Sequence, residues 1–160
     1  MKQKEMSNYL KMITTGIAIL LLLFVVWFLP TVLKDVLYEL GGKAGYSGVI
    51  ALIWATAIPC FLCLGIFWGI CTRIGKDRSF TMDNADALKK MSFLMMGDSV
   101  VYVVFLLWYF VVGWAKQAVW LVFPIVLGIF ICVTLSILCA ALSHLVQKAS
   151  VMQEEQELTI

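Results

Sequence analysis

Four long blocks of apolar residues set the main constraint on what this chain can fold into. They cover residues 12–33, 49–71, 92–114 and 118–145, and each has the roughly 20 residues that a helix needs to cross about 30 Å of hydrocarbon. Lipid offers backbone N–H and C=O groups no partner, so such blocks are typical of transmembrane helices. Hydrophobic residues make up 62% of the chain. The sequence predicts an all-α integral membrane protein, with a single four-helix domain over residues 1–160.

Basic residues are distributed unequally between the two sides that four spans would define. Nine lysines and arginines fall in the amino-terminal segment, the loop 72–91 and the tail 146–160, whereas three fall in the connections on the other side. Short loops rich in lysine and arginine stay in the cytoplasm. We therefore expect both termini and the central loop to be cytoplasmic, with a lipid bilayer around the spans.

The connection after the first block predicts a short helix on the outer surface. Four apolar side chains repeat there at helical spacing: Leu33, Val36, Leu37 and Leu40. Gly41-Gly42 then ends the pattern. A helix with one apolar face is expected to lie along the membrane interface. The other outer connection, residues 115–117, has room only for a tight turn.

Small residues suggest how the helices pack. The second block contains Gly65 and Gly69 as a G-x-x-x-G pattern, and the fourth block carries small residues at every fourth position: Gly128, Cys132, Ser136 and Ala140. Small residues allow membrane helices to approach closely. We expect these two faces to pack against each other.

The chain has five cysteines, of which Cys60 and Cys63 form a C-x-x-C pattern. A metal site needs thiolates and further polar groups that orient them. The neighbours in the sequence are apolar, and no carboxylate or histidine is expected at that depth. We interpret these cysteines as small hydrophobic side chains, and we predict neither a metal nor any other cofactor.

One acidic residue, Asp98, falls inside the third block. Aspartate costs about 2.5 to 3.5 kcal/mol at the middle of a membrane helix, so its side chain should face the bundle or a wet cavity. It could tie helices together through Tyr102, Thr72 or His144. Alternatively, it could bind a proton or a cation. Asp98, Tyr102 and His144 are therefore the candidate intramembrane polar site.

The remaining hydrophilic residues gather on the predicted cytoplasmic side. The loop predicts a helix that begins near Thr81, is capped by Thr81 or Ser79, lies on the inner membrane surface and runs on into the third block. The tail is acidic with an apolar tip. We predict a partner-binding surface from both segments: Arg73, Lys76, Arg78, Phe80, Thr81, Asn84, Glu154, Glu155, Glu157 and Ile160. Alternatively, this surface only fixes the topology and touches anionic headgroups.

Two short patterns carry a resemblance to a known family. They are Ile74-Gly75 followed by Ser79-Phe80-Thr81 and Asn84-Ala85, and the end Glu157-Leu158-Thr159-Ile160. This layout resembles a bacterial family of small four-span proteins of unknown function, sometimes called the YoaS-like family. Its members are often encoded beside a helix-turn-helix regulator. The resemblance implies the bacterial cytoplasmic membrane and a cytoplasmic protein partner, and it implies no catalytic residues.

The sequence contains no nucleophile–base pair, phosphate-binding loop or metal cluster, so we expect neither an enzyme nor direct binding of nucleic acid. We expect a regulatory or sensory module that binds a cytoplasmic protein, with a transcription regulator as the candidate. One alternative is a small transporter or channel subunit that uses Asp98. Another is an accessory subunit whose Gly65–Gly69 face docks on a membrane-protein partner or on a second copy of the chain.

Overall fold

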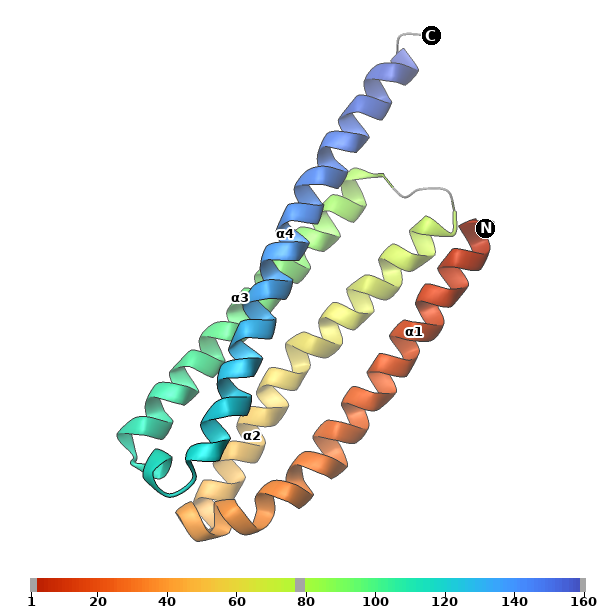
Figure 1. Ribbon diagram of the computed structural model, residues 1–160. Helices are drawn as coiled ribbons and strands as arrows, with labels where there is room; N and C mark the ends of the chain where they lie inside the picture. Colours follow the sequence, from red (N-terminus) through yellow and green to blue (C-terminus); the bar gives the residue numbers. More distant parts are fainter. Residues whose placement is uncertain (1–2, 77–79, 159–160) are drawn as a thin grey trace.

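The computed structural model describes residues 3–76 and 80–158, without the side chains of residues 3 and 156–158. The regular structure in this part of the chain is helical, as the sequence predicted. The elements are α1 (Gln3–Leu23), the π-helical turn η1 (Phe24–Phe28), α2 (Leu29–Ile74), α3 (Met82–Val111), the 3₁₀ turns η2 (Trp114–Lys116) and η3 (Val119–Leu121), and α4 (Val122–Leu158) (Figure 1).

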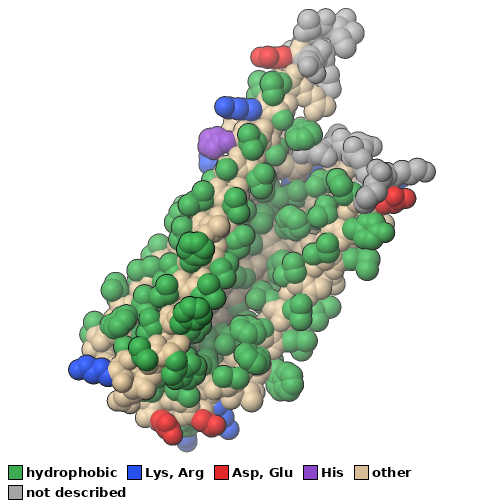
Figure 2. All heavy atoms as spheres, viewed as in Figure 1, with side chains coloured by type: hydrophobic (Ala, Val, Ile, Leu, Met, Phe, Trp, Pro, Cys, Tyr) green, Lys and Arg blue, Asp and Glu red, His purple; other side chains and the backbone are tan. Residues whose placement is uncertain are grey.

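Three helical segments of the described chain are long and apolar enough to cross a membrane: Lys4–Ile74, Met82–Val111 and Val119–Glu155. Hydrophobic side chains cover the flank of the molecule, and charged side chains gather towards its two ends (Figure 2). This distribution suits a bilayer, which solvates apolar side chains along its core and charged ones at its surfaces.

The first of these segments folds back on itself at Gly42. Its 71 residues would extend about 106 Å as one straight helix, but Gly42 interrupts the helix with φ 60° and ψ −155°. Figure 1 shows α1 and the later part of α2 side by side, running in opposite directions. Near the open end of this hairpin, the Ser7 hydroxyl donates to the Cys71 carbonyl oxygen at 2.6 Å. The Gly41-Gly42 pair therefore ends the helical pattern, as the sequence predicted.

The residues before Gly42 do not form the separate surface helix that we expected. They continue from α1 through η1, a π-helical turn just before Pro30, which cannot donate a backbone N–H. Leu37 is 2% exposed and belongs to a buried cluster with Tyr109 and Trp114. Three further apolar side chains of the segment pack against that cluster: Leu33, Val36 and Leu40. The amphipathic pattern is real, but its apolar face covers protein instead of lipid.

The same buried cluster holds the connection between α3 and α4. The Tyr109 hydroxyl donates to the Ala118 carbonyl oxygen at 2.7 Å. Trp114 meets the ring of Tyr109 edge-on, with 6.1 Å between ring centroids. These contacts fix the turn between α3 and α4 on the early part of α2, so the two helical hairpins are joined at this end of the molecule.

The opposite end carries the polar segments. The start of α1, the end of α4 and the connection between α2 and α3 all lie there, and α4 projects beyond the other helices (Figure 1). The predicted helix in the central loop is the start of α3, which runs from Met82 to Val111 without a break. Residues 72–76, 80–91 and 146–158 therefore lie at one end of the bundle.

Replacing Gly42 by alanine should lower the free energy of unfolding by about 1–3 kcal/mol, because its backbone conformation is strained for any residue with a Cβ. Gly48 is the matched control, since a Cβ added there meets nothing within 4 Å. Gly48→Ala should leave the stability unchanged or raise it. Unfolding by sodium dodecyl sulfate in mixed micelles measures both, and equal transition midpoints for the two variants would contradict the assignment of the turn.

Candidate functional site

The stripe of small residues on α4 packs against α3. Ser136 is buried and donates its hydroxyl to the Ser92 carbonyl oxygen at 2.8 Å. A Cβ added at Gly128 would lie 3.8 Å from the ring of Tyr102. Of the two remaining members of the stripe, Cys132 is buried and Ala140 is half-buried. The small side chains allow α3 and α4 to approach closely.

The expected pairing of this stripe with Gly65 and Gly69 is wrong. A Cβ added at either glycine meets nothing within 4 Å, because α3, and not α2, contacts the stripe. Gly65 is exposed. Gly69 lines a cavity of about 310 Å³ between α2 and α3, beside Asp83 and Lys90.

Three buried serines of α4 form a contact that the sequence analysis missed. They are seven residues apart: Ser136, Ser143 and Ser150. Ser143 donates to the Ala85 carbonyl oxygen at 2.7 Å, and the Ser150 hydroxyl lies 3.2 Å from the Met82 sulfur. A side chain seven residues further along a helix lies only about 20° behind the first one around the helix axis, whereas a side chain four residues further lies about 40° ahead of it. The seven-residue repeat was visible in the sequence, while the four-residue stripe drifts outward to the exposed His144.

Asp98 lies where three helices meet. Its side chain is 2% exposed and faces the bundle, as expected. One carboxylate oxygen, Oδ2, accepts from the Cys60 thiol of α2 at 3.9 Å and from the Cys132 thiol of α4 at 3.8 Å. The other oxygen, Oδ1, is buried and has no hydrogen-bond partner among the described residues.

The partners of Asp98 differ from those that we expected. The Tyr102 hydroxyl donates to Thr56 at 3.4 Å, Thr72 bonds back to Trp68 of its own helix, and His144 is exposed. The cysteines, interpreted as having no carboxylate nearby, supply the contacts instead. Each contact joins residues on different helices, so spacing along the sequence could not reveal it.

These contacts satisfy the Asp98 carboxylate only weakly. Thiols are weak hydrogen-bond donors, and a carboxylate without a strong partner is costly in an apolar interior. No group of three or more His, Cys, Asp or Glu side chains in the described chain could hold a metal ion. The arrangement offers one oxygen to a proton or to a small cation.

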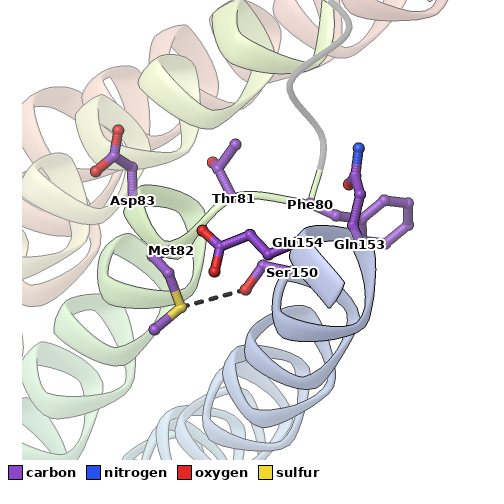
Figure 3. Close-up of a pocket in the computed structure, with 7 residues that line it drawn as sticks. All are labelled: Phe80, Thr81, Met82, Asp83, Ser150, Gln153 and Glu154. Atoms are coloured by element: carbon purple, nitrogen blue, oxygen red, sulfur yellow. Dashed lines mark hydrogen bonds between the residues drawn. The ribbon is translucent and has the colours of Figure 1, made fainter. Parts of the chain in front are cut away.

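A groove of about 300 Å³ lies between the start of α3 and the projecting part of α4 (Figure 3). Seven residues line it: Phe80, Thr81, Met82, Asp83, Ser150, Gln153 and Glu154. Three residues of the predicted partner-binding surface, Phe80, Thr81 and Glu154, therefore come together from segments that are distant in the sequence. The contact between Ser150 and Met82 joins the two walls.

Thr81 precedes α3 but does not cap it with its side chain. Its carbonyl oxygen accepts from the N–H groups of Asn84 and Ala85 at 3.0 and 3.2 Å. Its hydroxyl oxygen is buried and makes no hydrogen bond within the described chain. The capping bond expected of Thr81 is therefore absent, and the other expected cap, Ser79, lies outside the described residues.

Other residues of the predicted surface lie outside the groove. Arg73 donates to the carbonyl oxygen of Asp83 and to the side-chain oxygen of Asn84, both at 3.2 Å. Asn84 is 2% exposed, so it joins α2 to α3 and is not part of an exposed surface. Lys76 and Glu155 are exposed. The remaining three positions lie outside the described residues or side chains: Arg78, Glu157 and Ile160.

Comparison with protein families matches almost the whole chain to one family. The match covers residues 3–160, and the family is described as a protein of unknown function (DUF2975). The chain belongs to this family. No curated protein and no solved structure matches it. The DUF2975 assignment agrees with the expectation of a family of unknown function.

Replacing Ser136 and Ser143 together by alanine should lower the free energy of unfolding by about 1 kcal/mol, because each hydrogen bond between membrane helices contributes about 0.6 kcal/mol. Thr134→Ala is the control, since the Thr134 hydroxyl is exposed and bonds to Phe130 of its own helix. Unfolding in mixed micelles measures both. The packing of α4 on α3 would be contradicted if the double variant were as stable as the control.

Proposed function

We propose that this protein binds a cytoplasmic protein at the inner face of the bacterial cytoplasmic membrane. The observation that carries the proposal is the groove between α3 and α4, which combines Phe80 and Thr81 of the loop with Glu154 of the tail. Phe80 is 56% exposed although it is aromatic. Exposed aromatic side chains beside charged ones are typical of the residues that dominate binding energy in protein interfaces.

In this proposal the chain crosses the bilayer four times, with both termini in the cytoplasm. The reversal at Gly42 supports two crossings by the segment Lys4–Ile74. The loop 72–91 carries five basic residues and lies at the end of the bundle that carries the groove, which supports a cytoplasmic position. Residues 146–158 of α4 would extend about 18 Å from the membrane and present one wall of the groove.

The resemblance to the YoaS-like family points to a helix-turn-helix regulator as the partner. The protein would then act as a regulatory or sensory module that holds the regulator at the membrane. One wall of the groove belongs to α3 and the other to α4, and both helices continue into the bundle. A change in how these helices pack would alter the groove and release or capture the partner.

Phe80→Ala should abolish recovery of a partner that co-purifies with the intact protein from native membranes, because truncating a central aromatic residue commonly costs 2 kcal/mol or more, about 30-fold in affinity. Deletion of residues 153–160 should do the same. Phe93→Ala is the matched control, since Phe93 is 81% exposed on α3 and does not line the groove. A partner that is recovered equally with Phe80→Ala and with Phe93→Ala would contradict the proposal.

A second function, transport of protons or small cations, is favoured by the unpartnered Oδ1 of the buried Asp98. Transport pathways in membrane proteins commonly use such carboxylates. In proteoliposomes, Asp98→Asn should then reduce flux to the level of empty liposomes, while Thr134→Ala should leave it unchanged. Wild-type flux equal to that of empty liposomes would contradict this second function and leave the first unaffected.

A further inference from the structure

Hydrogen-bond acceptors predominate in the groove between α3 and α4. Asp83 and Glu154 contribute two carboxylates to its lining, and Asp83 also lies beside Arg73 and Lys90 in the neighbouring cavity. Ser150 already donates its hydroxyl hydrogen inside the protein, to the Gln147 carbonyl oxygen at 2.8 Å or to the sulfur of Met82. The groove therefore suits a donor with positive charge.

The apolar lining restricts what that donor can be. Figure 3 shows the Glu154 carboxylate directed towards Thr81 and Met82, with the Phe80 ring beside Gln153 at the edge of the groove. A guanidinium group can stack its flat face on an aromatic ring while its N–H groups bond to a carboxylate in a bidentate manner. An ammonium group is a hydrated point charge and offers neither contact as well.

We infer that the groove binds an arginine side chain of the partner protein. The guanidinium would bond to Glu154, Asp83 would add negative charge, and Phe80 and Met82 would cover the aliphatic stem. The volume of about 300 Å³ lies at the small end of ligand cavities, which fits one side chain. This inference rests on the proposed function, because it names the chemistry by which the partner is recognised.

The test uses full-length protein in phosphatidylcholine nanodiscs, with ¹³C-labelled methionine methyl groups. Met82 lines the groove, whereas Met152 is exposed on α4 outside it, so one methyl group reports binding and the other serves as the internal control. The probe is N-acetyl-arginine amide. N-acetyl-citrulline amide has nearly the same shape without the charge, and ethanolamine represents the cationic headgroup of a common lipid.

Arginine amide should shift the Met82 resonance in a saturable manner and leave that of Met152 in place, and citrulline amide should shift neither. Glu154→Gln should weaken arginine binding about tenfold, as expected for loss of one charge-assisted hydrogen bond. Asp83→Asn should weaken it less. Asp86→Asn is the matched control, because Asp86 is exposed on α3 and does not line this groove.

Equal shifts with arginine and citrulline amides, or unchanged binding in Glu154→Gln, would overturn the inference. Tighter binding of ethanolamine would also overturn it and would identify a lipid headgroup as the ligand. The experiment needs no partner protein, so its outcome is separate from that of co-purification. If a partner is captured through Phe80 but arginine amide does not bind, the inference is refuted and the proposed function stands. If arginine amide binds but no partner is captured, the proposed function is refuted.

Discussion

Lipid cannot accept or donate backbone hydrogen bonds, and the rest of this structure follows from that constraint. Apolar blocks must be helical throughout, so the chain can reverse only where the helices end. At one end of the molecule the reversals use Gly42 and Gly113, both with positive φ. Trp114 of the buried cluster lies against Gly41, beside the first of these turns. The opposite end carries the start of α1, the end of α4 and the start of α3. The groove lies there because two helices of unequal length leave an unfilled space beside the longer one.

Within the bundle, polar groups determine which helix faces which. Apolar side chains gain little by packing on each other when the alternative is lipid, so the serines of α4 and the small residues around them select α3 as the neighbour. Asp98 and its two thiols link α2, α3 and α4 at one point. Asp98 is also the least well satisfied of these polar groups, because its Oδ1 has no hydrogen-bond partner among the described residues.

Features that depend on neighbouring residues could be predicted from the sequence, and features that depend on helix rotation could not. The apolar blocks, the break at Gly41-Gly42 and the start of α3 after Thr81 are local properties. The cysteine contacts of Asp98 and the isolation of Gly65 and Gly69 depend on which face each helix turns inward. The four-residue stripe on α4 suggested the wrong neighbour, and the seven-residue serine repeat would have given a better face. The sequence predicted that Phe80 and Glu154 lie on the same side of the membrane. It did not predict that they line one groove.

Cysteine labelling can determine whether the groove between α3 and α4 faces the cytoplasm, as we propose. Phe80→Cys and Lys43→Cys each place a thiol at an exposed position, at opposite ends of the molecule, and the parent protein with its five native cysteines gives the background. A membrane-impermeant maleimide applied to intact cells should label Lys43→Cys at once. It should label Phe80→Cys only after the membrane has been opened. Labelling of Phe80→Cys in intact cells would contradict the account.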